Sequence, residues 1–136
     1  MRILIVEDEL ASRKFLKHVM TSYGECRAVE DGAAALQAFT EALEIGNRYD
    51  LICLNIMMPE MDGQDALKEI RVIEQEFGVP PRLETKVMMT TAPTDPANVM
   101  EAYYKGGASL YLTKPLDVEK IREAMIELGF LKKSIE

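Results

Sequence analysis

Polar side chains follow four short apolar runs of the sequence, each time at the C-terminal end of the run. The four pairs are residues 3–6 with Glu7 and Asp8, 51–54 with Asn55, 87–89 with Thr90 and Thr91, and 110–112 with Thr113 and Lys114. If these runs are parallel strands, their C-terminal ends lie at one edge of a sheet, where open α/β sheets form their ligand sites. We therefore expect two acids, an amide, a hydroxyl and an ammonium group to converge in one pocket.

This combination of groups is suited to phosphoryl chemistry. Carboxylates such as Glu7 and Asp8 supply the hard oxygen ligands of Mg²⁺, which is typically held by one or two carboxylates together with waters and phosphate oxygens. Lys114 adds a compact positive charge for a phosphoryl oxygen, and the Thr91 hydroxyl can donate a hydrogen bond to another. The set as a whole predicts a phosphoryl-binding site, although two adjacent acids alone are a weak signal.

The elements that must position this pocket alternate between strand and helix patterns. Apolar residues recur at helical spacing over 10–20, 32–45, 63–77 and 118–128, and Asp95-Pro96 begins a further helix that Gly106-Gly107 ends. A short second strand is expected over 26–29 and the last one over 109–113. Because the first and third strands are apolar on both faces, this order predicts an α/β fold in which helices cover both faces of a parallel sheet.

Length and composition limit the other possibilities. A chain of 136 residues, 48% of them hydrophobic, is expected to form one domain over 1–136. The net charge of −7 argues against a nucleic-acid surface, and no apolar stretch is long enough for a membrane span. We expect a cytoplasmic protein, in which Cys26 and Cys53 are reduced structural thiols.

Four segments of the chain resemble the receiver domains of two-component response regulators, close to the single-domain chemotaxis type. They are residues 3–9 (ILIVEDE), 50–63 (DLICLNIMMPEMDG), 89–92 (MTTA) and 107–115 (GASLYLTKP), and they cover essentially the whole chain in the right order. The resemblance implies a flavodoxin-like, doubly wound five-stranded parallel sheet of order 2-1-3-4-5 with five helices.

The resemblance also implies a metal site. Glu7 and Asp8 match the family's Mg²⁺-binding acids, and the backbone carbonyl of Met57 would be a further ligand. Asn55 occupies the position of the aspartate that accepts the phosphoryl group. An amide can offer one oxygen to a metal, so Mg²⁺ binding should be weakened but need not vanish.

Other residues match the catalytic and switching positions of the family. Thr91 resembles the switch hydroxyl, Lys114 the active-site lysine, and Tyr111 the aromatic residue that turns inward or outward as that hydroxyl moves. The bond between Lys114 and Pro115 resembles one that is usually cis in this family. The face formed by the fourth helix, the fifth strand and the fifth helix would be the signalling surface.

Each of these residues also has an ordinary structural interpretation. Glu7 and Asp8 could only favour the positive end of a helix dipole, and Asn55 could form an Asx turn before the turn-rich residues 59–63. Thr91 could be a turn hydroxyl, and Lys114 a solvent-exposed side chain. Tyr111 could be a half-buried strand aromatic. Joint placement at one sheet edge is what favours the functional interpretation.

The residue at position 55 leaves two function classes open. An amide oxygen is a poor nucleophile because its lone pairs are delocalised and it carries no charge, so this chain should not be phosphorylated there. The chain is either a signalling receiver whose parent form has a carboxylate at 55, or a natural pseudo-receiver that binds partners independently of phosphorylation. Keeping Glu7, Asp8, Thr91 and Lys114 fits a recent or deliberate Asp-to-Asn change at least as well as a natural pseudo-receiver. A flavin carrier or a phosphohydrolase is disfavoured because no Ser/Thr-rich phosphate loop follows the first strand and Met57 stands where a second acid would be needed.

The expected partners follow from the resemblance. They are a histidine kinase or phosphotransfer protein as phosphoryl donor and a downstream protein target, with no nucleic acid and no membrane. We expect a monomer or weak dimer that modifies at most itself and is not an enzyme with independent turnover.

Overall fold

The computed structural model describes residues 1–94 and 107–133. Its elements, in chain order, are β1 (Arg2–Val6), α1 (Leu10–Met20), β2 (Glu25–Val29), α2 (Gly32–Glu44), β3 (Leu51–Asn55), α3 (Gly63–Glu76), a short 3-10 helix (Pro81–Leu83), β4 (Lys86–Thr91), β5 (Leu110–Thr113) and α5 (Val118–Glu127). These bounds lie within one to two residues of the predicted ones. The largest difference is at the end of β4, which extends two residues further than predicted and includes both threonines.

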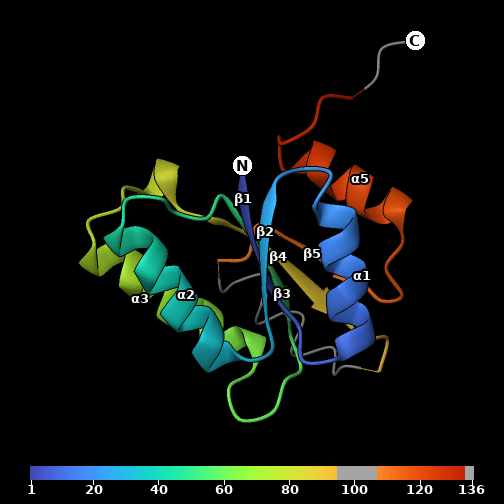
Figure 1. The fold of residues 1–136 in the computed structure, drawn as a ribbon, viewed down its shortest axis with the longest axis horizontal. Coiled ribbons are helices and arrows are strands. Elements are labelled where there is room, and N and C mark those ends of the chain that lie inside the picture. The colour runs from blue at the N-terminus through green and yellow to red at the C-terminus, as the bar shows by residue number, and fades with distance from the viewer. Residues whose placement is uncertain (95–106, 134–136) are drawn as a thin grey trace.

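The five strands form one parallel sheet in the order β2-β1-β3-β4-β5. Helices α2 and α3 cover one face of it, and α1 and α5 cover the other (Figure 1). The predicted doubly wound sheet and its strand order are therefore confirmed. The described part of the chain holds four α-helices, and the fifth one predicted, over 95–106, lies outside the described residues.

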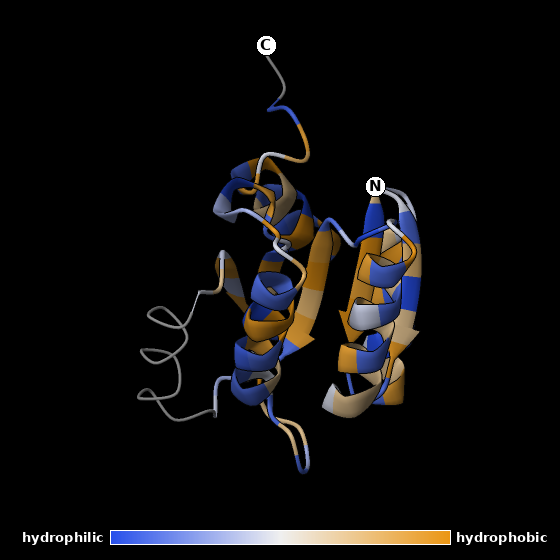
Figure 2. Ribbon diagram, turned by 90° about the vertical axis from the view of Figure 1, so that its left-hand side faces the viewer, coloured by the Kyte–Doolittle hydropathy of each residue, from blue (hydrophilic) through white to orange (hydrophobic). Residues whose placement is uncertain are grey.

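Two apolar layers hold the helices to the sheet. The layer under α2 and α3 includes Leu4, Phe39, Ile52, Leu67 and Ile70, and the layer under α1 and α5 includes Ile3, Leu16, Met20, Leu51 and Met125. Strands β1 and β3 contribute to both layers because alternate side chains point to opposite faces. Figure 2 shows a mostly hydrophobic sheet between helices whose outer sides are largely hydrophilic. Both cysteines are free thiols; Cys53 is buried in this core, and Cys26 is partly buried against it.

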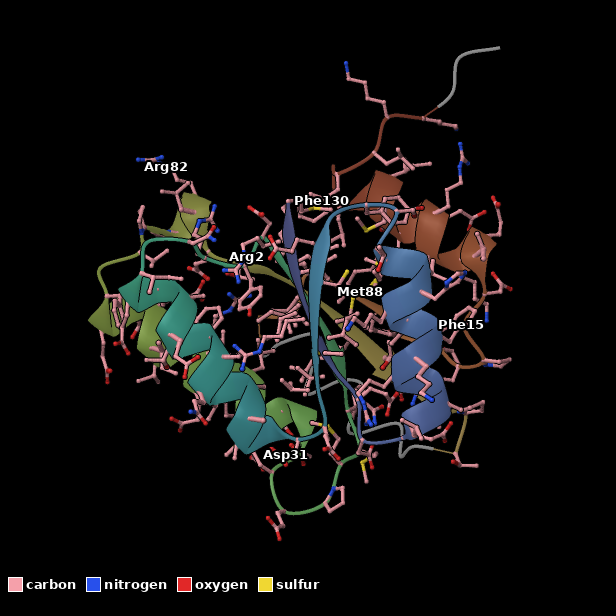
Figure 3. The ribbon with its side chains drawn as sticks, viewed as in Figure 1. Arg2, Phe15, Asp31, Arg82, Met88 and Phe130 are labelled. Atoms are coloured by element: carbon pink, nitrogen blue, oxygen red, sulfur yellow. The ribbon has the colours of Figure 1, made fainter. Side chains whose placement is uncertain are left out.

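Three helices begin at an aspartate that caps them. The carboxylates of Asp31, Asp62 and Asp117 each accept a hydrogen bond from the backbone N–H three residues later, at 2.7–2.9 Å. Such caps satisfy one of the backbone donors that a helix leaves unpaired at its start. The caps of α2 and α3 fix where these helices begin, at the C-terminal edge of the sheet (Figure 3, Asp31). No helix within 1–94 or 107–133 has the length and apolar character needed to cross a membrane.

An ion pair with a buried carboxylate joins α3 to the N-terminal edge of the sheet. The Glu74 carboxylate, 2% exposed as a residue, accepts hydrogen bonds from Arg71 Nη1 and from the backbone N–H of Thr85, both at 2.7 Å. Arg71 also donates to the carbonyl oxygens of Thr85 at 2.9 Å and Gly107 at 2.8 Å. One guanidinium group therefore joins α3 to the segments that lead into β4 and β5.

Candidate functional site

The predicted polar residues meet at the C-terminal edge of the sheet. Glu7 directly follows β1, Asn55 ends β3, Thr91 ends β4, and Lys114 directly follows β5. In Figure 1 these strand ends lie at the lower edge of the sheet, below the end that carries the N-terminus. In Figure 3 the labelled Asp31 lies toward this edge and Arg2 toward the other.

Glu7 is the buried charge at the centre of the site. It is 0% exposed, and its Oε1 accepts a hydrogen bond from Lys114 Nζ at 2.7 Å. Its Oε2 accepts one from the backbone N–H of Glu9 at 3.1 Å. Burial raises the pKa of Glu7, whereas the Lys114 ammonium and the Glu9 N–H act against that rise because they stabilise the ionised form. The Lys114 ammonium group is thus the main positive charge that balances this buried carboxylate.

Asn55 connects this carboxylate to the rest of the pocket through its side-chain nitrogen. Nδ2 lies 2.9 Å from Asp8 Oδ1, 3.1 Å from the Met57 carbonyl oxygen and 3.2 Å from Glu7 Oε2. The reverse amide orientation would place Oδ1 against three oxygens that cannot donate to it. The residue is only 6% exposed. The sequence indicated that this amide can offer one oxygen to a metal; in this structure its nitrogen faces the other three predicted ligand atoms.

The loop that supplies the Met57 carbonyl is held by Gly63, the first residue of α3. The Gly63 N–H donates to the Ile56 carbonyl at 2.7 Å, and a Cβ at this position would lie 2.5 Å from the Asn55 carbonyl oxygen. Only glycine allows so close an approach of α3 to the end of β3. Sequence reasoning used Gly63 as a helix start and as part of the family resemblance, and it missed this packing role.

Thr91 ends β4, Tyr111 lies within β5, and Lys114 directly follows β5. Thr91 is 1% exposed, and its carbonyl accepts a hydrogen bond from the Lys114 N–H at 2.7 Å, which joins the ends of β4 and β5. Tyr111 is half-buried on β5 and packs against the apolar layer under α2 and α3. The peptide bond between Lys114 and Pro115 is cis, as the resemblance implied.

An apolar pocket of about 430 Å³ adjoins the charged cluster. It is lined by Glu9, Ala11, Ser12, Phe15, Pro93, Lys114, Pro115 and Leu116. Lys114 therefore stands between the buried Glu7 carboxylate and an open apolar surface on the α1 side of the site.

The oxygen atoms at the site fit a divalent cation. No three His, Cys, Asp or Glu side chains in the described segments are grouped to hold a metal. The oxygens at this site come from two acids, Glu7 and Asp8, and the Met57 carbonyl, and the Asn55 side chain is the fourth group beside them. All three oxygens lie within 3.2 Å of one point, which the Asn55 nitrogen occupies. Mg²⁺ binds oxygen at about 2.0–2.1 Å, so the oxygens would have to close in and the amide would have to turn its oxygen inward. The residues can therefore hold the ion once the oxygens have moved closer and the Asn55 amide has turned.

The chain is thus a doubly wound α/β domain whose acids, lysine and threonines lie at the edge where such folds bind ligands. Comparison with known proteins specifies the family. Residues 3–126 match the response regulator receiver domain, and the chain belongs to this family. It is therefore a receiver domain of two-component signalling.

Individual relatives agree with this assignment. The chain is 31% identical over 126 residues to the chemotaxis protein CheY of Bacillus subtilis, covering 91% of this chain and 93% of that protein. The CheY of Thermotoga maritima is 32% identical over 126 residues with the same coverage. Among solved structures, the receiver domain of the Arabidopsis thaliana histidine kinase CKI1 in complex with Mg²⁺ and BeF₃⁻ has a TM-score of 0.74 and 31% identity, covering 90% of this chain and 87% of that one.

Proposed function

We propose that this chain is a receiver domain locked in its unphosphorylated form by Asn55. The observation that carries the proposal is that Glu7, Asp8, Met57 and Lys114 form one connected cluster around position 55, while the residue there is an amide. A pocket that keeps the groups for phosphoryl chemistry but lacks the nucleophile is competent to bind and unable to react.

The chemistry of the parent form follows from the same groups. A carboxylate at position 55 would attack the phosphorus of a phosphohistidine, the P–N bond would break, and the imidazole would leave. Lys114 and the Thr91 hydroxyl would stabilise the phosphoryl oxygens. Mg²⁺, held by Glu7, Asp8, the Met57 carbonyl and the side-chain oxygen of residue 55, would neutralise negative charge as the phosphoryl group transfers.

The partners that we propose are those of a two-component pathway in the cytoplasm. A histidine kinase or phosphotransfer protein would approach the site, where the apolar pocket beside Lys114 offers contact surface. The signalling surface would include β5 and α5, with Tyr111 responding to Thr91. The domain, residues 1–136, would act through protein contact as a monomer or weak dimer, without independent enzymatic turnover.

The test is intact mass after incubation with Mg²⁺ and a small phosphodonor such as acetyl phosphate. The chain itself should gain no phosphoryl group, and Asn55→Asp should gain one. The double variant Asn55→Asp with Lys114→Ala is the matched control, and it should gain the group more slowly. If neither the chain nor Asn55→Asp is modified, the proposal of a locked receiver is wrong.

A second candidate is a natural pseudo-receiver that binds its partner constitutively. The observation that favours it is that the Asn55 nitrogen already contacts both acids and the carbonyl, so the pocket is satisfied without a phosphoryl group. In that case Asn55→Asp would accept a phosphoryl group with no change in partner affinity. In a locked receiver the same modification would change that affinity.

A further inference from the structure

We propose that the Asn55 side-chain amide replaces the divalent cation structurally. It holds the oxygens of the pocket together, so the pocket is stable without a metal. The inference rests on the proposed function for the identity of the three cation ligands, which are Glu7, Asp8 and the Met57 carbonyl. It goes further than the proposed function because it gives Asn55 a stabilising role, whereas the proposed function says only that this residue lacks the nucleophile.

The geometry carries the first step. A cation at this edge would hold together three oxygens from two segments of the chain, the end of β1 and the loop after β3. The Asn55 nitrogen lies within hydrogen-bond distance of all three, at 2.9–3.2 Å. An amide nitrogen has two hydrogens, so at least one is shared between two acceptors. The amide therefore bridges the same atoms that the cation would bridge.

The charges carry the second step. The Glu7 carboxylate is paired with the Lys114 ammonium group, and the Arg13 guanidinium donates to the Glu7 backbone carbonyl at 2.9 Å, whereas Asp8 contacts the neutral Asn55 amide. Asn55 brings the positive end of its N–H dipoles to these carboxylates without adding charge. A carboxylate at position 55 would add a third negative charge in a mostly buried place, and like charges this close disfavour ionisation of one another. The aspartate form needs a cation, whereas the asparagine form supplies its own donors.

The consequence is that the Asn55 amide and Mg²⁺ compete for the same three oxygens. For Mg²⁺ to bind here, the Asn55 side chain must turn, which breaks all three of its contacts. The ion must also lose part of its hydration shell, which Mg²⁺ does reluctantly. Mg²⁺ should therefore stabilise the fold of this chain much less than that of Asn55→Asp.

The experiment is thermal unfolding of the chain and of Asn55→Asp, each in EDTA and in 10 mM Mg²⁺. In EDTA, Asn55→Asp should unfold about 5 °C or more below the parent chain, and Mg²⁺ should restore most of that loss. The parent chain should shift by less than about 2 °C between the two conditions. Asn47→Asp, which adds the same charge at an exposed position, is the matched control and should follow the parent.

A second measurement does not depend on how the variant folds. In ¹⁵N-labelled parent chain, the two side-chain N–H protons of Asn55 should exchange with water more slowly than those of the exposed Asn47. They should also keep their resonance positions at Mg²⁺ concentrations that saturate Asn55→Asp. Fast exchange, or a parent chain that gains as much stability from Mg²⁺ as the variant, would overturn the inference.

The failure of this inference and that of the proposed function are distinguishable. If Asn55→Asp accepts a phosphoryl group but unfolds at the parent's temperature in EDTA, the amide has no cation-like role and the receiver proposal stands. If the variant loses stability in EDTA and accepts no phosphoryl group, only the locked-receiver proposal fails.

Discussion

The two edges of the sheet both bury a carboxylate, and they satisfy it in different ways. At the N-terminal edge, Glu74 accepts from the Arg71 guanidinium and from the Thr85 N–H, both at 2.7 Å. At the C-terminal edge, Glu7 accepts from a lysine ammonium at 2.7 Å and from two longer contacts, Glu9 N–H at 3.1 Å and the Asn55 amide at 3.2 Å. The first network contains a rigid, fork-shaped donor, and the second contains flexible ones.

This difference separates a structural network from one that can be rearranged. A guanidinium has several donors in fixed geometry, so Arg71 holds three acceptor atoms of its surroundings in one arrangement. Lys114 carries its ammonium group on a flexible stem, and the Asn55 amide can turn toward a ligand when its three contacts are given up. The comparison teaches that burial alone does not distinguish a structural carboxylate from one that can meet a ligand, and that the two carboxylates differ in the donors around them.

The largest effect is expected from breaking the structural network with Arg71→Ala. This change leaves the Glu74 carboxylate buried with only the Thr85 N–H, and loss of one partner from a buried ion pair costs about 3–5 kcal/mol. Urea unfolding measures it. The matched control is Arg27→Ala, because the Arg27–Glu41 pair, 3.5 Å apart with both side chains half exposed, should contribute about 0–1 kcal/mol. Equal losses for the two variants would contradict the comparison.

A smaller effect is expected from crowding the functional edge with Gly63→Ala. The added Cβ would lie 2.5 Å from the Asn55 carbonyl oxygen, so backbone must move, and we expect a loss of about 2 kcal/mol in the free energy of unfolding. Gly32→Ala is the control, because a Cβ there would meet the flexible side chain of Met61 at 2.7 Å. A loss for Gly32→Ala as large as that for Gly63→Ala would show that the backbone contact is unimportant.

The fold was largely predictable from the sequence, for a reason that particular strands make clear. Residues 3–6 and 51–54 are apolar at every position, which requires a sheet covered on both faces and fixes their place at its centre. The C-terminal polar residues then follow from the parallel direction of the strands. The predicted meeting of Glu7, Asp8, Asn55 and Lys114 is therefore a consequence of topology.

What the sequence did not disclose depends on contacts between distant segments. The Asn55 amide faces inward with its nitrogen because the Met57 carbonyl and Asp8 converge on it, which no local pattern encodes. Arg71 and Glu74 lie three residues apart on a helix, the spacing of an ordinary surface pair. Glu74 is buried and Arg71 is partly buried because the segment before β4 and Gly107 contact them.

A third variant, Lys114→Met, removes the counter-charge of Glu7 and should make stability depend on pH. The ammonium stabilises only the ionised carboxylate, so its contribution is present above the Glu7 pKa and disappears as pH falls through it. That pKa is raised above 4.5 by burial, and loss of Lys114 would raise it further. We expect the free energy of unfolding of Lys114→Met to be about 2 kcal/mol lower than that of the parent near pH 8, and this difference should shrink toward pH 4.5.

Urea unfolding of the parent and of Lys114→Met across this pH range checks the prediction. Lys14→Met, at an exposed position of α1, is the control and should show no such narrowing. A difference between parent and Lys114→Met that grows as pH falls would contradict the assignment of Lys114 as the partner of ionised Glu7.

The smallest effect concerns two buried threonines, one at each edge of the sheet. The Thr85 hydroxyl donates to the Tyr49 carbonyl at 2.8 Å, whereas the Thr90 hydroxyl has no hydrogen-bond partner among the residues that the structure describes. Both residues are 1% exposed. Thr85→Val should cost about 1 kcal/mol because it removes a bond and leaves a buried carbonyl with one contact fewer. Thr90→Val should be neutral or stabilising because it removes a buried polar group that gains nothing from burial.

Urea unfolding of both valine variants decides the comparison at the level of single hydroxyl groups. Thr90 pairs with Asn55 in the sheet register, so its variant also shows whether the functional edge tolerates an apolar neighbour. If Thr90→Val costs as much as Thr85→Val, the Thr90 hydroxyl is satisfied in solution and belongs to the polar network of the site. If Thr90→Val costs no stability, the C-terminal edge contains an unsatisfied hydroxyl, whereas the Thr85 hydroxyl at the N-terminal edge is satisfied. This is the result expected if the polar groups of the C-terminal edge are arranged for a ligand.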